Sequence, residues 1–382
     1  MRFIIMTSEQ RHEARYKRRK SKRTEKRKAF LDQHNDFSKL IDIDNLYKAY
    51  HKCTLGVNWK SSTQRYSSKW MENLIEARRK LMYGEDVRTG FVHFMLHERG
   101  KTRRISSVHI SERVIQKCLC DQVLTPVLSR FLIYDNSAST VNRGTSFALR
   151  RLQVHMLKYY RRHGVDGYAL MIDYSGFFDS IRHDILLYKI HQYIKDEKVF
   201  NLIKGFITAF GPEKSLGLGS QVSQICALFY PSREIDLFIK QKLMIKFCGR
   251  YMDDLYLIHH SKEYLKYCLK MIARNSEHLG LKVNLTKTRI VTLRHGLIFL
   301  KGRYSLTASG RIIKRPCRGS TVRMRKRLKR FRHLLDIKKM SRWDVYSSYE
   351  SWRGTYRRRF HAYYRVGKMD ALYNQLFLYD RE

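Results

Sequence analysis

The sequence Tyr251-Met252-Asp253-Asp254 places two adjacent carboxylates between two short runs of strand-forming residues, Met244 to Cys248 and Leu255 to Ile258. This pattern predicts a hairpin with the acids at its tip. Neighbouring side chains on a straight strand point to opposite faces, so a turn is needed to bring both acids to one site. Two ionised carboxylates side by side repel each other unless a cation lies between them. The segment therefore indicates a divalent-metal site, with an ordinary exposed turn as the alternative.

The charge of the chain points to a polyanionic partner. Lysine and arginine number 77 against 34 aspartate and glutamate residues, which gives a formal net charge of +43 over 382 residues. Repulsion on this scale is tolerated mainly when the usual partner is a polyanion, so nucleic acid is the first choice and an anionic membrane surface the second. A hydrophobic share of 43%, with 25 tyrosines and 19 phenylalanines, is typical of a folded protein large enough for two or three domains.

Membrane insertion and zinc knuckles are not expected. The sequence has no apolar run of about 18 residues and no signal-peptide pattern, which favours a cytoplasmic location. Its seven cysteines are scattered and form no Cys-x-x-Cys pair, so zinc knuckles and redox motifs are excluded. We expect reduced thiols that mostly fill the core.

The order of patterns along the chain predicts a mixture of helices and strands. Helical spacing runs from Asp44 to Tyr83 and from Ser111 to Leu132, and the segment Phe91 to His109 alternates like a hairpin with its loop at residues 97–102. A strongly basic helical tail starts at Thr321. The nearly continuous basic run from Arg11 to Lys28 has two readings, a solvated tail or a nucleic-acid-binding arm.

A second acid lies where the apolar strand Tyr168 to Ile172 delivers Asp173 to its carboxyl end. Asp173 and Asp253 are 80 positions apart, on separate predicted strands. If these strands are neighbours in one sheet, Asp173 converges with Asp253 and Asp254. Three carboxylates are the set needed to hold two Mg²⁺ ions about 3.5–4 Å apart for in-line phosphoryl transfer.

From about residue 90 to residue 310, the chain resembles the reverse transcriptase family, with motifs in the same order. The Asp173 segment, an acid followed by a small loop and two aromatics, resembles the first catalytic motif, and Tyr251 to Asp254 resembles the catalytic hairpin. Asp179, just after the first motif, is expected to cap the next helix. The other matches are the finger strand with Lys101, Arg103 and Arg104, the finger motif from Tyr134 to Ser146, the Gly219-x-x-x-Ser223 loop, the motif from Leu279 to Lys287 and the primer-grip turn Phe299 to Gly302.

The resemblance implies that Asp173, Asp253 and Asp254 are catalytic and bind two Mg²⁺ ions, with Mn²⁺ as an alternative metal, together with the backbone carbonyl of Tyr174. Asp254 either binds the metal directly or tunes the site. Phe178 stands where the family places an aromatic ring under the sugar. A ring there collides with a 2′-hydroxyl group, which predicts a preference for deoxynucleotides.

The resemblance also assigns residues to the nucleotide and to the nucleic acid. Cationic side chains supply donors for phosphate oxygens, and glycine allows the backbone to approach closely. The residues expected to bind the incoming nucleotide are Lys101, Arg103, Arg104, Phe178, Gly219, Ser220, Gln221 and Lys287, of which Lys287 either donates a proton to pyrophosphate or is a surface lysine. The residues expected to contact template and primer are Tyr251, Met252, Arg143, Leu300, Gly302, Arg325, Arg327 and Arg330.

The implied fold is α+β, a right-hand polymerase with fingers, palm and thumb, in which an antiparallel palm sheet packs on helices. We predict a basic N-terminal extension over residues 1–40, N-terminal helices and fingers over 41–165, a palm over 166–305 and a basic helical thumb over 306–382. In the thumb, basic side chains would hold phosphates. Its aromatics, among them Trp352 and Tyr356, either stack on bases or fill the core, and the core is favoured.

The expected activity is RNA-directed DNA synthesis, with an RNA template, dNTPs and a DNA product as partners, no membrane, and a homo-oligomer allowed. Most relatives carry Gln before the glycine and Pro after the serine of the loop motif, where this chain has Leu218 and Gln224. A similar Gly-x-x-x-Ser-Gln loop recurs in the enzymes of diversity-generating elements. No endonuclease or RNase H motif is found, which favours a stand-alone enzyme dedicated to a noncoding RNA. Antiphage defence is preferred as its role, with a retron or a diversity-generating element as alternatives.

Two hypotheses from other classes stay open. An RNA-templated RNA polymerase would use the same acids, but Phe178 argues against it. A non-catalytic RNA-binding protein would explain the charge of the chain but not three acids at family spacing.

Overall fold

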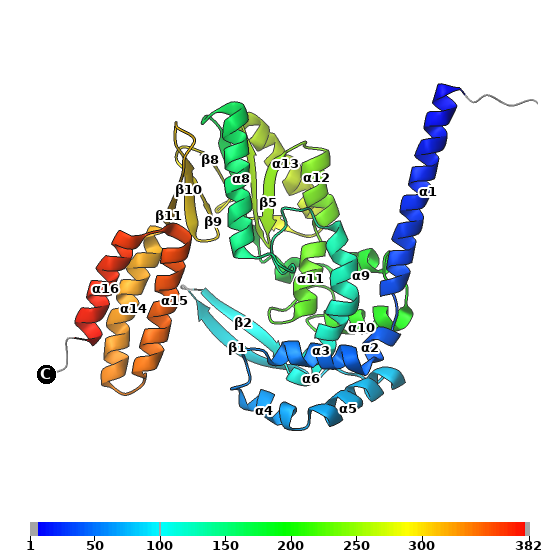
Figure 1. Cartoon of the computed structure of the whole chain (residues 1–382), viewed down its shortest axis with the longest axis horizontal. Coiled ribbons are helices and arrows are strands. Elements are labelled where there is room, and N and C mark those ends of the chain that lie inside the picture. The colour runs from blue at the N-terminus through cyan, green and yellow to red at the C-terminus, as the bar shows by residue number, and fades with distance from the viewer. Residues whose placement is uncertain (1–6, 99–100, 379–382) are drawn as a thin grey trace, which may run out of the picture. The chain divides into compact units, whose positions relative to one another are not determined.

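The structure is a computed structural model of the chain that describes residues 7–98 and 101–378. It is α+β, as predicted, with many helices and antiparallel strands (Figure 1). The chain divides into two compact units. Unit 1 contains the residues up to Asn142, Tyr174–Phe238 and Ile272–Val283, and unit 2 contains Arg143–Asp173, Ile239–Met271 and the residues from Asn284 onward. The predicted boundaries at residues 40, 165 and 305 remain predictions.

Unit 1 is mainly helical. Its helices are α1 (Ser8–His34), α2 (Ser38–Ile41), α3 (Ile43–Thr54), α4 (Ser61–Ser68), α5 (Trp70–Tyr83), α6 (Ile110–Leu119), α7 (Thr125–Leu128), α9 (His183–His191), α10 (Glu197–Thr208) and α11 (Gln221–Phe229). Its strands are β1 (Phe91–Glu98), β2 (Lys101–Val108), β4 (Tyr174–Ser175) and β7 (Lys282–Val283). Two helices, α12 (Phe238–Gln241) and α13 (Lys262–His278), run from one unit into the other.

Apolar residues at helical spacing join α3 and α6 in the core of unit 1. Leu46 and Ala49 on α3 are buried, as are Val114 and Cys118 on α6, and the two helices lie in contact. Residues three and four positions apart share one face of a helix, so each helix turns a continuous apolar side to the other. Five of the seven cysteines are buried and the described residues contain no disulfide, as expected for thiols that fill the core.

Two local predictions in unit 1 need correction. The strands of the β1–β2 hairpin extend further than predicted, because His97 pairs with Thr102 and Glu98 with Lys101. The predicted helix from Ser111 to Leu132 instead begins at Ile110 and is followed by a π-helical turn at Cys120–Leu124 and by α7. The cap of α6 is His109, whose ring nitrogen accepts a hydrogen bond from the Ser111 amide.

Unit 2 holds a four-stranded antiparallel sheet in the order β5-β6-β3-β8. Its strands are β5 (Phe247–Tyr251), β6 (Asp254–His259), β3 (Tyr168–Ile172) and β8 (Arg289–Thr292). The helix α8 (Thr145–His163) packs on it, with Leu152, Met156 and Tyr159 in the same buried cluster as Ala169 and Tyr256. Helix and sheet are also joined by a hydrogen bond of 2.9 Å between the His155 ring and the Tyr256 hydroxyl group.

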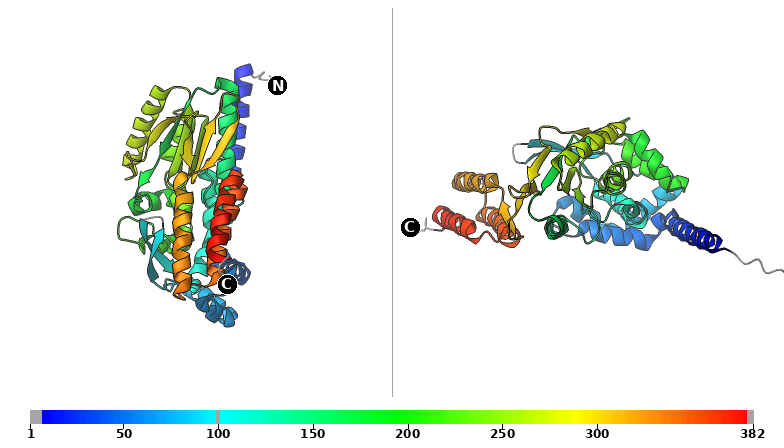
Figure 2. Two further views of the ribbon diagram at one scale, coloured as in Figure 1. Left: turned by 90° about the vertical axis from the view of Figure 1, so that its left-hand side faces the viewer. Right: turned by 90° about the horizontal axis from the view of Figure 1, so that it is seen from above.

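The C-terminal part of unit 2 contains a small sheet and three helices. The sheet has the order β11-β10-β9, formed by β9 (Leu297–Phe299), β10 (Gly302–Leu306) and β11 (Ile312–Pro316). The helices α14 (Arg318–Asp336), α15 (Arg342–Phe360) and α16 (Tyr363–Phe377) lie side by side (Figures 1 and 2). Trp352 packs against their apolar cluster and Tyr356 is buried, as the preferred reading of these aromatics predicted. Tyr363 and Tyr364 are exposed.

Among the described residues, no helix combines the length and the apolar character that crossing a membrane requires.

Candidate active site

The predicted hairpin is confirmed. Strands β5 and β6 pair in a register that matches Tyr251 with Asp254, which leaves Met252 and Asp253 as a two-residue turn. Tight two-residue hairpin turns require positive φ angles, and Met252 adopts φ 54°. This conformation is uncommon for a residue with a side chain. The backbone at the tip is therefore held in a strained conformation beside the two acids.

The register of the neighbouring strand brings the third acid to the same place. Strand β3 pairs with β6 so that Ile172 lies opposite Leu255. Asp173 and Asp254 are the residues that come directly after this last pair, and the charge of Asp173 acts on Asp254. Directly opposite residues of an antiparallel pair share one face of the sheet, with Cβ atoms about 4.5–5.5 Å apart. The sheet thus explains how acids 80 positions apart in the sequence come together.

The electrostatics of Asp254 show that the acids act on one another. Burial raises the pKa of Asp254 to about 7, and the negative charges of Asp253 and Asp173 add to this rise, while Lys287 opposes it. A carboxyl group keeps its proton near neutral pH when too little positive charge surrounds it to stabilise the ionised form. A cation at this position would relieve the repulsion.

Lys287 supplies part of that positive charge. Its ammonium group forms an ion pair with the carboxylate of Asp173, whose side chain is 18% exposed. The backbone places the lysine there, because the amide of Asn284 donates to the carbonyl of Asp173 at 2.8 Å. Asn284 then accepts from the Lys287 amide through both its backbone and its side chain, and from the Thr286 hydroxyl group at 2.7 Å.

The donor set suits a hard divalent cation, although the described residues contain no ready-made cluster of three metal-binding side chains. Carboxylate oxygens are the ligands that Mg²⁺ prefers. The raised pKa of Asp254 indicates the charge deficit that a metal ion would fill. Asp173, Asp253 and Asp254 thus remain the candidate ligands. The predicted fourth ligand is the backbone carbonyl of Tyr174; this residue begins β4 and its hydroxyl group bonds that of Ser276 at 3.2 Å.

The predicted phosphate-binding side chains on β2 diverge. Arg103 and Arg104 are both exposed, opposite Leu96 and Met95 on β1. Because they are consecutive on a strand, their side chains point to opposite faces of the hairpin. Only one of the two can therefore face a given triphosphate while the strand keeps this geometry. The predicted contact of Lys101 lies outside the described side chains.

The glycine-rich loop is attached to the β1–β2 hairpin within unit 1. Gly219 adopts φ +124°, and a Cβ atom there would lie 2.6 Å from the carbonyl oxygen of Ser106. The Ser106 amide also donates to the carbonyl of Leu218 at 3.1 Å. A glycine is needed because no other residue allows this approach of two backbones.

Ser220 and Gln221 begin the helix that follows the loop. Ser220 is buried, donates its hydroxyl hydrogen to Gln116 at 2.8 Å, and accepts from the Ser223 amide as the cap of α11. Its hydroxyl group is thus committed to holding the loop against α6. Gln116 was not predicted from the sequence, because nothing local in the chain distinguishes it from an ordinary helix residue. Gln221 is half-buried at the first position of α11.

Phe178 lies in a short 3₁₀ turn, Phe178–Ser180, and is half-buried, with its ring edge-on to Phe177 at 5.7 Å. Its carbonyl accepts from the Leu216 amide at 2.9 Å, so the first motif and the glycine-rich loop are directly joined. The expectation that Asp179 caps the next helix is wrong. An extended Ile181 separates the turn from α9, and Asp179 instead accepts a hydrogen bond of 3.4 Å from the Ser215 hydroxyl group.

The residues predicted to contact template and primer are spread over unit 2. The Tyr251 hydroxyl group lies 3.5 Å from that of Thr145, and the Arg143 guanidinium group lies over the Phe147 ring. Leu300 has φ 46° in the turn between β9 and β10, and Gly302 faces the Phe360 ring. Arg325, Arg327 and Arg330 are exposed on α14, and Met252 occupies the hairpin turn described above.

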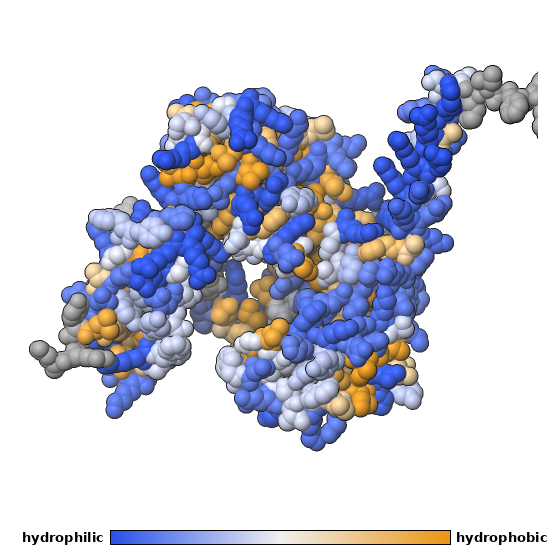
Figure 3. All heavy atoms as spheres, viewed as in Figure 1, coloured by the Kyte–Doolittle hydropathy of each residue, from blue (hydrophilic) through white to orange (hydrophobic). Residues whose placement is uncertain are grey.

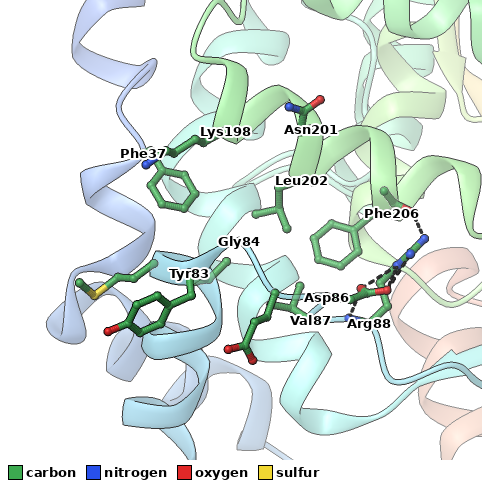
Figure 4. A pocket seen from close by; sticks show the side chains of 14 residues that line it. Phe37, Tyr83, Gly84, Asp86, Val87, Arg88, Lys198, Asn201, Leu202 and Phe206 are labelled. Atoms are coloured by element: carbon green, nitrogen blue, oxygen red, sulfur yellow. Dashed lines mark hydrogen bonds and ion pairs between the residues drawn. The ribbon is translucent and has the colours of Figure 1, made fainter.

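Unit 1 also contains a cavity of about 640 Å³ that is lined by none of the predicted site residues (Figure 4). Apolar side chains, among them Leu202 and Phe206, form part of its wall. The Asp86 carboxylate is paired with the Arg88 guanidinium group, and Lys198 lies over the Phe37 ring. With its ionised side chains paired in this way, the cavity offers no catalytic set.

The sequence matches a known family over the region that holds these residues. A family model described as "Reverse transcriptase (RNA-dependent DNA polymerase)" matches residues 95–327. None of the curated proteins matches the chain. Among solved structures, it is similar to a C-terminally truncated apo telomerase from Candida tropicalis, with 14% identity, coverage of 64% of this chain and 60% of that chain, and a TM-score of 0.46.

A second similar structure is the telomerase from Candida albicans in complex with a fragment of telomeric RNA. It has 12% identity and a TM-score of 0.47, with coverage of 66% of this chain and 50% of that chain. Another apo telomerase structure from Candida tropicalis is similar at 13% identity, with coverage of 64% of this chain and 52% of that chain and a TM-score of 0.46. The chain thus spans between half and three-fifths of the telomerase chains that it matches.

Proposed function

The chain belongs to the reverse transcriptase family, as the match over residues 95–327 shows, and we propose that it extends a primer with deoxynucleotides on an RNA template. The predicted family and its enzyme class, RNA-directed DNA polymerase, are confirmed. The observation that carries the proposal is the register of β3 and β6, whose last pair directly precedes Asp173 and Asp254 and so brings these acids to the turn that holds Asp253. Metal-assisted phosphoryl transfer needs several carboxylates close together, because they bind the divalent cations that stabilise the attacking and leaving oxygens.

The three acids would hold two Mg²⁺ ions, or Mn²⁺ in their place. When bound, the metal supplies positive charge that activates the primer hydroxyl group and neutralises the departing pyrophosphate. The contribution of the three acids to catalysis is their fixed position. Asp173 and Asp254 approach from two paired strands and Asp253 from the turn, so rigid secondary structure fixes all three. Rigid placement of this kind reduces the entropy that binding of a charged substrate costs.

Lys287 would act on the leaving group. Its side chain is 48% exposed, and its ammonium group already lies at the acids, in the ion pair with Asp173. With Asp173 engaged as a ligand, Lys287 would leave the ion pair and be available to the triphosphate. There it would stabilise the developing charge and donate a proton to the departing pyrophosphate.

Primer extension with purified protein tests the proposal. We expect Mg²⁺-dependent incorporation of dNTPs on an RNA template, and loss of incorporation in Asp253→Asn and Asp254→Asn. Asp179→Asn is the matched control, because this acid bonds Ser215 and belongs to no predicted ligand set. RNA affinity should persist in all three variants. Incorporation that survives in Asp253→Asn would show that the assigned metal site is wrong.

The same assay separates the alternatives. An RNA-templated RNA polymerase would incorporate ribonucleotides at least as well as deoxynucleotides. A non-catalytic RNA-binding protein would incorporate neither and would bind RNA equally with or without the acids. Family membership supports catalysis over binding alone.

For the biological role, we infer a dedicated noncoding RNA template and a part in antiphage defence, with retron and diversity-generating functions as alternatives. The sequence shows no endonuclease or RNase H motif, which supports a dedicated template, whereas Gln224, in place of the usual proline of the loop motif, supports the diversity-generating alternative. In the structure the Gln224 side chain accepts a hydrogen bond of 2.9 Å from the Ser139 hydroxyl group, so the substitution ties the loop to a finger motif. Sequencing the nucleic acid that co-purifies with the protein would identify the template.

A further inference from the structure

Helix α1 extends into solvent over most of its length. Every residue from Thr7 to Ala29 is exposed, and the helix buries no residue at all (Figure 1). Only its C-terminal end is anchored, where the Arg130 guanidinium group lies 3.3 Å from the centre of the Phe30 ring and the His34 ring bonds the carbonyl of Gln122. A helix without tertiary packing is marginally stable in water, so this one needs another source of stability.

Five cations form a line along one side of the exposed part. They follow one another at intervals of four, three, four and four residues, which keeps them on a single helix face. We call them the basic stripe: Arg11, Arg15, Arg18, Lys22 and Lys26. At 1.5 Å per residue the stripe extends over about 22 Å. Figure 3 shows this helix covered by hydrophilic residues.

The acids of the helix form no ion pair with the stripe. Glu13 pairs with Lys17 at 2.8 Å on the far side of the helix, while Glu25, which lies beside the stripe three residues after Lys22, accepts a hydrogen bond from Ser21 at 2.7 Å. None of the stripe residues forms an ion pair within the described part of the chain. Like charges four residues apart on a helix repel each other. A polyanion that lies along the stripe would remove this repulsion and stabilise the helix together with the complex.

The remaining side chains of the exposed part narrow down the kind of polyanion. Tyr16 is its only aromatic residue, so it offers no series of rings on which single-stranded bases could stack. A membrane-surface helix needs a broad apolar face, and besides Tyr16 this part carries only Ala14 and Ala29 as apolar residues. A straight line of cations without stacking groups suits the regular phosphate backbone of a duplex.

We propose that the basic stripe of α1 binds the phosphate backbone of a base-paired RNA segment. The proposal rests on the proposed function, because that function makes RNA the nucleic acid that is present before synthesis begins. Contacts to phosphates carry no sequence information, so binding follows the presence of a stem and not its sequence. The stripe would thus anchor a structured part of the template RNA through unit 1.

Two triple variants that remove the same charge test the proposal. The stripe variant is Arg15→Gln, Arg18→Gln and Lys22→Gln, and the control variant is Lys17→Gln, Lys20→Gln and Lys28→Gln on the other side of the same helix. The probe is a labelled RNA hairpin, compared with an unstructured RNA and a DNA duplex of equal length. All six positions are exposed, so neither variant should change the thermal unfolding of the protein.

We expect the stripe variant to bind the hairpin at least about tenfold more weakly and to lower the log–log salt slope by roughly two to three, while the control variant stays within about twofold. The intact protein should prefer the RNA hairpin to both other probes. An equal loss of hairpin affinity in the two variants would overturn the proposed role of the stripe. It would indicate that binding depends only on the total positive charge of the helix. Equal binding of unstructured RNA or of the DNA duplex would overturn the assignment of the partner.

A second readout separates this proposal from the proposed function. Primer extension at saturating template should be unchanged in the stripe variant, because the stripe takes no part in the chemistry. If the intact protein fails to polymerise but the hairpin binding depends on the stripe, the proposed function fails and the inference about α1 stands. If the protein polymerises but the stripe variant binds the hairpin as well as the intact protein does, the proposed function stands and the inference about α1 fails.

Discussion

The ammonium group of Lys287 forms an ion pair with the carboxylate of Asp173, although 114 positions separate the two residues. Asn284 makes this possible, because its amide donates to the Asp173 carbonyl and starts the turn that carries the lysine back over the acid. The pair places a positive charge on Asp173 that also acts on Asp254. A metal ion that binds Asp173 must compete with this charge, and so the lysine is coupled to metal binding.

Replacing Lys287 with Ala should slow polymerisation by about 10², the usual range for loss of a general acid. The Mg²⁺ concentration for half-maximal activity should fall at the same time, because the competing cation is gone. Single-turnover extension at several Mg²⁺ concentrations measures both effects. Lys282→Ala, an exposed lysine on β7, is the control. An unchanged rate in Lys287→Ala would show that this residue is only a surface lysine.

The metal-free protein should become less stable as the pH rises from about 4 to about 7. The pKa of Asp254 is about 7 in the folded protein against an ordinary value of 3.8, so the folded state holds this proton more tightly than the unfolded state. Stability then declines with pH between the two values and the loss is complete above the higher one. Thermal unfolding in EDTA at pH 5 and pH 7.5 measures the difference.

Asp254→Asn isolates the contribution of this one carboxyl group. The variant should unfold at a temperature higher by roughly 2–4 °C at pH 7.5 without metal, because a buried charge is removed and with it the repulsion by Asp253 and Asp173. At pH 5 the difference from the intact protein should shrink. A variant that is less stable than the intact protein at pH 7.5 would argue against charge repulsion at this position.

Replacing Phe178 with Ala should allow ribonucleotides to enter. The ring is half-buried and carried by the turn that is bonded to Leu216, so its position in unit 1 is fixed, and in the proposed role of Phe178 its truncation would remove the group that excludes a 2′-hydroxyl. We expect the preference for dNTPs over NTPs to fall by at least about tenfold, from kcat/KM values for matched nucleotides. Phe178→Tyr keeps the ring and should keep the preference. A preference that survives in Phe178→Ala would assign sugar selection to another residue.

Gly219→Ala should destabilise the protein by about 1–3 kcal/mol, because the residue has a positive φ and its Cβ would meet the Ser106 carbonyl at 2.6 Å. Gly205→Ala is the matched control. It lies within α10, where the added methyl group would meet no atom within 4 Å, and alanine favours a helix. Urea unfolding of both variants measures the change. A neutral Gly219→Ala would mean that the loop does not approach β2 this closely in solution.

The sequence alone was sufficient for features that depend on neighbouring residues. The hairpin at Tyr251 to Asp254 and the strand that ends before Asp173 follow from runs of apolar residues and the turn between them, which are local properties. The same local reasoning failed at Asp179, where a helix cap was expected. It also failed after Leu119, where a π-helical turn interrupts the predicted helix. At Asp179 a hydrogen bond from the distant Ser215 takes the place of the expected local cap.

The tertiary structure decided which residues meet. Nothing in the sequence states that β3 lies between β6 and β8, yet this order brings Asp173 to the end of β6 that carries Asp254 and leaves Asn284 in reach of the Asp173 carbonyl. The order of strands is fixed by the burial of whole faces against α8, to which many distant residues contribute at once. The raised pKa of Asp254 has the same origin, because it arises from burial and from charges that only the folded sheet brings together.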